Sequence, residues 1–233
     1  SVTGVEVNGA TLEILRHTYR DHFRRWVEDP RVRLVHEEGR HFLASQPDLY
    51  DVIQLSGVDS VSGTPGAAHV FSESYLYTAE AIDLYLSRLA PEGVLNLMRP
   101  ESTPPREMLR LLASVVESLR RRGVERPAEH VMVLVDRRGS FVAVLAQPRP
   151  FAAEQVRRVA AWAGSNPTLA LGAAPGFAPS GPSAYAALLA APSARDLHAG
   201  LSRYPWDVRP VTDDRPFFFR TSRWSHLWPQ AGV

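Results

Sequence analysis

Four polar side chains stand at or just after the points where the sequence predicts that strands end. Apolar strands that alternate with helices form parallel sheets, and the carboxyl ends of parallel strands share one edge of the sheet. Ligands of such sheets bind outside that edge, so polar groups that gather there are candidates for chemistry. The four candidate residues are Glu6, Glu38, Ser56 and Asp59.

The first two candidates are carboxylates suited to hydrogen bonding. A carboxylate at the position of Glu6 can accept two hydrogen bonds from a ribose diol, and the alternative is a solvated acid at the end of a strand. Glu38 is followed by Gly39, and a glycine lets a planar ring approach the backbone because it has no Cβ atom. Both positions therefore suit a ligand that carries hydroxyl groups and a flat ring.

The spacing of other reactive residue types does not support metal or hydrolase chemistry. His36 and His41 are five residues apart, as are His17 and His22, so neither pair matches the H-E-x-x-H helix of zinc enzymes. The sequence contains no G-x-S-x-G nucleophile elbow. We expect a site without a metal ion and without a hydrolase triad.

The composition of the chain excludes several functional classes for this protein. The chain has 233 residues, of which 45% are hydrophobic, so it can bury a core. Its 26 basic and 25 acidic residues give a net charge of +1, without the basic surplus that nucleic-acid binders carry. Cysteine is absent, which excludes disulfides and thiolate zinc sites. No apolar run reaches the roughly 18 residues that a membrane span needs.

Strands and helices are predicted to alternate as far as residue 147. This order indicates an α/β fold with a doubly wound, mainly parallel sheet, to which a hairpin adds a C-terminal antiparallel strand. The first helix carries an apolar stripe of Leu12, Leu15, Tyr19, Phe23 and Trp26. Predicted strands cover residues 2–8, 31–36, 50–56, 94–98, 130–135 and 140–147, and predicted helices cover 12–26, 41–44, 72–89 and 105–122.

Residues 148–233 are less regular and are predicted to form a helical and loop extension packed on a first domain of residues 1–147. Asp213-Asp214-Arg215 is interpreted as a motif that docks the tail, a structural role favoured over a catalytic one. Phe217 to Phe219 would then pack beside it or lead towards a membrane. The remaining expectations are a helix over 152–163, a loop or lid over 164–182, and short helices around 183–190 and 193–203.

Several segments taken together resemble the spermidine/spermine synthase family, which has the Rossmann-like class I methyltransferase fold. They are VTGVEVN, RVRLVHEEGRHFL, YDVIQLSGVDS and VFSESYLYTAEAIDLYLSRLAPEGVLNL, in that order and spacing. The resemblance implies that Glu6 binds the ribose hydroxyls of S-adenosylmethionine or its decarboxylated form. It implies that Glu38 and Gly39 lie against adenine, although the family more often has Asp at the first of these positions.

The resemblance also suggests an acceptor site, with one departure. The family's fourth strand ends in an Asp, with a second Asp three residues later; here these positions hold Ser56 and Asp59. A serine hydroxyl replaces neither the charge nor the basicity of a carboxylate at neutral pH, so aminopropyl transfer to a diamine is doubtful. Tyr77 is expected to face the cleft as a substrate-binding residue, and Tyr75 to lie in the core. The loop over residues 57–70 is interpreted as functional or as a flexible lid.

Three functions stay open on this evidence. The first is transfer of an aminopropyl or other alkyl group from a nucleoside cofactor to an unknown acceptor, a polyamine among the candidates. The second is a binding module without catalysis that recognises a nucleoside or a partner. The third is an S-adenosylmethionine-dependent methyltransferase.

A closer resemblance is to bacterial proteins that attach such a domain to membrane-spanning helices. It rests on DVIQLSGVDS, SESYLYTAEA and TDDRPFFF. The chain begins with Ser1 and has its first Met at position 98, so we expect the family's first strand and Gly-rich loop to precede it. The resemblance implies a place at the cytoplasmic face of an inner membrane, through parts outside this chain, and leaves a homodimer open.

Overall fold

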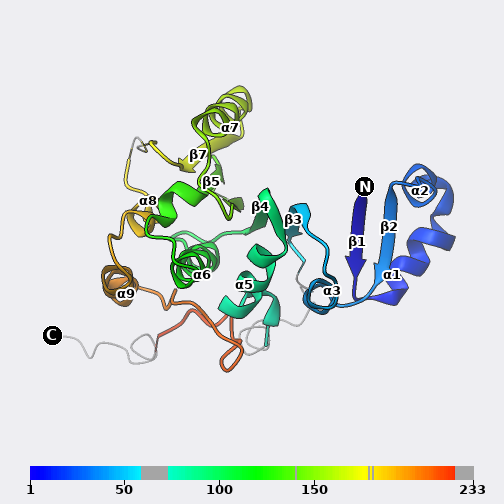
Figure 1. Ribbon diagram of the computed structural model, residues 1–233, viewed down its shortest axis with the longest axis horizontal. Coiled ribbons are helices and arrows are strands. Elements are labelled where there is room, and N and C mark those ends of the chain that lie inside the picture. The colour runs from blue at the N-terminus through cyan, green and yellow to red at the C-terminus, as the bar shows by residue number, and fades with distance from the viewer. Residues whose placement is uncertain (59–72, 140, 178, 180, 224–233) are drawn as a thin grey trace. The chain divides into compact units, whose positions relative to one another are not determined.

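The computed structural model describes residues 1–58, 73–139, 141–177, 179 and 181–223 (Figure 1). Its contacts group into two compact units, Ser1–Asp48 and Leu49–Val233. Both units combine strands with helices, so the predicted mixed α/β class is confirmed. The predicted division of the chain at residue 147 into a domain and an extension stays a prediction.

The first unit is built on two parallel strands. These are β1 (Val2–Glu6) and β2 (Val32–His36), paired so that Glu6 lies opposite His36. The parallel pairing predicted for these two segments is therefore confirmed. The connecting helices are α1 (Gly9–Glu13), a π-helical turn (Ile14–Thr18) and α2 (Arg20–Val27), and α3 (Gly39–Ser45) follows β2.

The apolar stripe predicted along the first helix is wrong for its second half. Leu12 is buried, whereas Tyr19 and Trp26 each leave 57% of their surface exposed. The π-helical turn interrupts the α-helix at Ile14–Thr18. An inserted π turn changes the rotation between residues, so positions three or four apart no longer stay on one face.

The second unit contains a five-stranded sheet in the order β3-β4-β6-β5-β7. β3 and β4 are parallel, while the pairs β4–β6, β5–β6 and β5–β7 are antiparallel. The predicted hairpin is confirmed as β5 followed by β6, but the sheet is less parallel than predicted because β6 lies between β4 and β5. The strands are β3 (Tyr50–Ser56), β4 (Leu89–Pro100), β5 (Val131–Asp136), β6 (Phe141–Ala146) and β7 (Leu169–Ala173).

Strand β7 corrects the prediction that residues 164–182 form a loop or lid throughout. Its sequence, Leu-Ala-Leu-Gly-Ala, has little of the β-branched and aromatic content that marks strands. A Cβ atom at Gly172 would lie 3.0 Å from Cγ1 of Val135 on β5, so the glycine lets the Val135 side chain pack close to the β7 backbone. Pairing with β5, rather than local propensity, makes this segment a strand.

Helices α5 (Ala79–Ser87) and α6 (Glu107–Arg121) follow β3 and β4, lie next to each other (Figure 1) and contain most of the buried helical residues. The helix predicted from residue 72 begins at Ala79, after a 3-10 turn at Tyr75–Tyr77. The Thr78 hydroxyl accepts a hydrogen bond from the Ala81 amide, and this N-cap fixes where α5 starts. The later helices are α7 (Ala153–Ser165), α8 (Ala184–Leu189) and α9 (Ala194–Arg203).

Candidate functional site

The first unit brings Glu6 and the Glu38–Gly39 step to one edge of its sheet. β1 and β2 are parallel, so their carboxyl ends share that edge, and the Glu37 amide donates a 3.1 Å hydrogen bond to the Glu6 carbonyl. Glu6 Oε1 accepts a 2.7 Å hydrogen bond from the Asn8 amide at the exposed surface. A carboxylate has about four acceptor positions, so most of the capacity of Glu6 is open to a ligand.

Glu38 is already engaged by its own helix. Its two carboxylate oxygens accept hydrogen bonds of 3.0 Å from the Arg40 amide and 2.8 Å from the His41 amide, which makes it the N-cap of α3. Next to it, a Cβ atom built on Gly39 would meet nothing within 4 Å. A flat ring can therefore approach the backbone at Gly39, and the Glu38 side chain serves mainly to fix the turn that exposes it.

In the second unit, Ser56 is the last residue of β3 and pairs with Met98 of the parallel strand β4. The Gly57 amide donates a 3.0 Å hydrogen bond to the Met98 carbonyl, and Gly57 has a φ of 61°, which suits glycine. This left-handed residue lets the chain turn away at the end of the strand. Asp59 and most of the predicted loop 57–70 lie outside the described residues.

The exposures of two tyrosines are the opposite of those predicted. Tyr75 exposes 46% of its surface, whereas Tyr77 exposes 1%. The segment was predicted as the first turn of a long helix, but it forms a separate 3-10 turn with a different rotation per residue. The direct contact of Tyr77 with a substrate stays a prediction.

Tyr77 belongs to a buried cluster around Arg99, which follows Met98 on β4. The Tyr77 hydroxyl accepts a 2.8 Å hydrogen bond from Arg99, and Glu107 on α6 forms a 3.0 Å ion pair with the same guanidinium. The guanidinium carbon lies 5.4 Å from the ring centre of Phe218 and 5.1 Å from that of Phe219. Burial lowers the pKa of Arg99 and raises the pKa of Tyr77. The cluster joins β4 to the C-terminal segment.

The C-terminal segment, residues 204–223, is fixed beside the start of α5. Asp213 Oδ1 accepts a 2.7 Å hydrogen bond from the Thr78 hydroxyl, and the Asp213 amide donates to Glu80 at 3.1 Å. Backbone hydrogen bonds of 2.8 Å join Ala79 to Val211 and Ser74 to Pro216. The docking role predicted for Asp213 is confirmed, as is the packing of Phe218 and Phe219, which are buried.

Glu101, just after β4, is a second acid at the end of a strand, but its carboxylate oxygens already accept hydrogen bonds from neighbouring residues. Oε1 accepts from the amides of Ser102 and Arg106, at 2.7 and 2.9 Å. Oε2 accepts from the Met108 amide at 3.0 Å and the Tyr185 hydroxyl at 2.9 Å. Burial raises the pKa of Glu101. With four donors around it, the carboxylate supports the start of α6 and does not replace the acid missing at Ser56.

Among the described residues, no group of three or more His, Asp or Glu side chains is arranged to hold a metal ion. No helix within the same residues is long and apolar enough to cross a membrane.

No model of a known protein family matches the chain. Over 105 residues it is 34% identical to polyamine aminopropyltransferase 2 from Pseudomonas aeruginosa; the match covers 41% of this chain and 28% of that protein. The chain therefore spans under a third of that relative's length.

Similar solved structures include spermidine synthase from Thermotoga maritima, at 19% identity over 67% of this chain and 50% of that one, with a TM-score of 0.42. Another is human methyltransferase-like protein 13 in complex with SAH, at 18% identity over 67% and 66%, with a TM-score of 0.44. Because these TM-scores are below 0.5, the relationship rests on the sequence similarity.

Proposed function

Because the chain is related to the spermidine synthase-like proteins of the class I methyltransferase fold, we propose that it forms part of a transferase that binds an adenosyl cofactor. In this proposal Glu6 accepts hydrogen bonds from the ribose hydroxyls, and adenine lies over Gly39. The observation that carries it is the shared edge of β1 and β2, where a surface carboxylate and an open glycine stand together.

The test is calorimetric titration of the full protein with methylthioadenosine, a nucleoside without the sulfonium charge. Glu6→Gln keeps the shape of the side chain but loses the charge-assisted hydrogen bonds, so we expect at least a tenfold loss of affinity. Glu13→Gln, an exposed acid on α1 away from the strand ends, is the matched control. Absence of binding, or equal affinity of the Glu6 variant and the wild type, would refute the proposal.

For the reaction itself we propose alkyl transfer to an acceptor other than a simple diamine. In such a step the bond from sulfur to the transferred carbon breaks, a bond to the acceptor nucleophile forms, and the acceptor loses a proton. Asp59, three residues after Ser56 in the sequence, is the remaining carboxylate proposed to hold the acceptor or take that proton. Mass analysis of products separates aminopropyl transfer from methyl transfer, and the absence of any product would favour a binding module.

The sequence resemblance also leads us to propose that this domain works at the cytoplasmic face of a membrane, as part of a larger protein. Fractionation of cells that express the full protein would test this. Recovery in the soluble fraction alone would contradict it.

A further inference from the structure

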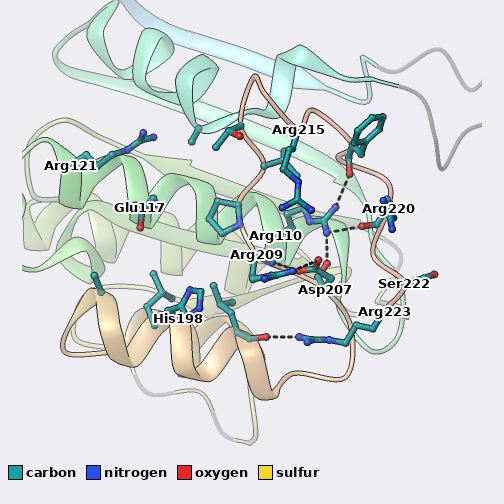
Figure 2. Close-up of a pocket in the computed structure, with 18 residues that line it drawn as sticks. Arg110, Glu117, Arg121, His198, Asp207, Arg209, Arg215, Arg220, Ser222 and Arg223 are labelled. Atoms are coloured by element: carbon teal, nitrogen blue, oxygen red, sulfur yellow. Dashed lines mark hydrogen bonds and ion pairs between the residues drawn. The ribbon is translucent and has the colours of Figure 1, made fainter. Parts of the chain in front are cut away.

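A cavity of about 680 Å³ lies within the second unit, between α6, α9 and the C-terminal segment (Figure 2). This volume is in the range of roughly 300–1,000 Å³ that is usual for small-molecule sites. Its lining residues extend from Ala79 to Arg223, and none of them belongs to the edge of β1 and β2 described above. The proposed nucleoside site does not explain this cavity.

The cavity wall carries a large excess of positive charge. Its lining includes two carboxylates, Glu117 and Asp207, against six guanidinium groups, an excess of four positive charges. Asp83 on α5 pairs with Arg121 at 3.0 Å from outside the lining, which still leaves an excess of three. The six arginines are Arg110, Arg121, Arg209, Arg215, Arg220 and Arg223.

Of the two acids, Asp207 is already committed. Its carboxylate receives two hydrogen bonds from Arg209, at 2.8 and 2.9 Å, in the paired geometry that Arg and carboxylate groups favour. The carboxylate is therefore bonded to Arg209, and its charge also acts on Arg110.

Arg110 sits at the centre of this arrangement with 2% of its surface exposed. Its guanidinium donates to the backbone carbonyls of Asp207, Phe217, Phe218 and Arg220. Carbonyl groups satisfy hydrogen bonds without neutralising the charge, and Arg110 Nε is buried without a partner among the described residues. The pKa of Arg110 is lowered to about 10, chiefly by burial; the charges of Asp207 and Glu107 oppose this effect, and those of Arg209 and Arg220 add to it.

Arg215 faces Arg110 from the C-terminal segment, and Figure 2 shows its side chain pointing towards it. Within the part of the chain that the structure describes, the Arg215 side chain has no ion pair or hydrogen bond. It is exposed, so it can move to meet a ligand. An anion beside Arg215 can accept paired hydrogen bonds from its guanidinium. Arg110 adds positive charge and one donor, Nε, because its other N–H groups are bonded to carbonyls.

We propose that this arginine-lined cavity binds a phosphate-bearing anion of multiple charge. A single carboxylate would neutralise only part of the excess, whereas a diphosphate or a phosphate ester matches it more closely. The same charge repels polyamines and the sulfonium of an adenosyl cofactor, so the cavity and the proposed nucleoside site select ligands of opposite charge. A soluble phosphate compound and an anionic lipid headgroup share this chemistry.

The experiment titrates the full protein with inorganic pyrophosphate at low ionic strength and measures the dissociation constant. Arg215→Gln should weaken binding at least fivefold while leaving the fold intact, because this exposed side chain makes no hydrogen bond or ion pair among the described residues. Arg158→Gln, an exposed arginine on α7 outside the cavity, is the matched control for net charge and should change the constant less than twofold. Equal weakening in both variants would overturn the proposal, because it would show a general charge effect.

A second arm separates the two sources of phosphate. Vesicles of phosphatidylglycerol are compared with vesicles of phosphatidylcholine for binding to the wild type and to Arg215→Gln. Binding to phosphatidylglycerol that depends on Arg215 and is displaced by pyrophosphate identifies a lipid headgroup, and binding of pyrophosphate alone identifies a soluble ligand. If neither pyrophosphate nor anionic vesicles bind, the proposal is wrong. The titration contains no nucleoside, so its outcome is independent of the proposed transferase function.

Discussion

The edge of β1 and β2 in the first unit and the contacts of the C-terminal segment in the second unit use charged residues in opposite ways. At the edge, Glu6 and Glu38 lie at the surface and bond to amides two or three residues away. In the second unit, Arg110 is buried and bonds to carbonyls 97 to 110 residues away. Exposed charges with local contacts keep acceptor capacity for ligands, whereas a buried charge with distant contacts fixes the backbone.

The two units also differ in how much core supports these charges. In Ser1–Asp48, a range that is described throughout, the buried apolar side chains are Leu12, Phe42 and Leu43. In the second unit, α6 alone buries eight apolar side chains among its fifteen residues. Changes at the edge should therefore alter binding with little effect on the second unit, and changes in the second unit should alter its stability.

The largest expected effect is that of Arg110→Met. Removal of the guanidinium deletes four hydrogen bonds to carbonyls that are buried or partly buried, so we expect the unfolding free energy to fall by about 3 kcal/mol or more. Urea unfolding measures the loss, and limited proteolysis should show cleavage between residues 207 and 221. Arg158→Met, at an exposed position of α7, is the control. An unchanged urea midpoint for the Arg110 variant would contradict the contrast between the two regions.

Acid should weaken the same region through Asp207. Burial alone would raise the pKa of Asp207, but the hydrogen bonds from Arg209 and the charge of Arg110 outweigh it and lower the pKa from 3.8 to about 2. A lowered pKa means that the carboxylate stabilises the fold above about pH 4, and that this contribution is lost as the pH falls from about 4 to about 2. Because the group is partly exposed, the loss should be at most about 2 kcal/mol. The unfolding free energy of Asp207→Asn, measured against pH, should lack this loss between about pH 4 and about pH 2. If the variant and the wild type lose stability identically in acid, Asp207 does not make this contribution.

Ser56→Asp tests whether the acceptor chemistry depends on the missing acid. A carboxylate at the end of β3 would bind a cationic amine and could take its proton, so we expect at least a tenfold faster formation of aminopropylated putrescine from decarboxylated S-adenosylmethionine. Ser56→Asn has nearly the same shape without the charge and should stay at the wild-type rate. Mass spectrometry of the products measures both. Equal rates for the two variants would show that the serine does not limit diamine transfer.

The parts of this molecule that the sequence predicts are those whose signals are local. The alternation of apolar residues around Val32–His36 and the continuous run at Tyr50–Ser56 predict two strands and where they end. The ends of the parallel strands Val2–Glu6 and Val32–His36 place Glu6 and Glu38 on one edge, as expected. The capping role of Glu38 was not predicted, although a carboxylate just before a helix is a recognisable N-cap signal.

The parts that were missed depend on contacts far along the chain. Arg110 lies in an amphipathic helix, where an arginine is normally solvated, and it is buried only because the C-terminal segment folds over it. The burial of Tyr77 likewise involves packing against Phe218, 141 residues later in the chain. No local pattern contains this information.

The smallest expected change, Gly39→Ala, separates binding from folding at the edge of β1 and β2. Gly39 opens α3 and its Cβ position is clear of other atoms within 4 Å, so alanine should raise stability by about 0.5 kcal/mol by reducing the freedom of the unfolded chain. The added methyl group occupies the space where a flat ring would approach, so affinity for methylthioadenosine should fall about fivefold. Thermal unfolding and calorimetric titration of the same sample measure the two effects. Because stability should rise while affinity falls, loss of the fold cannot account for the loss of binding. Unchanged affinity would show that adenine does not bind over Gly39.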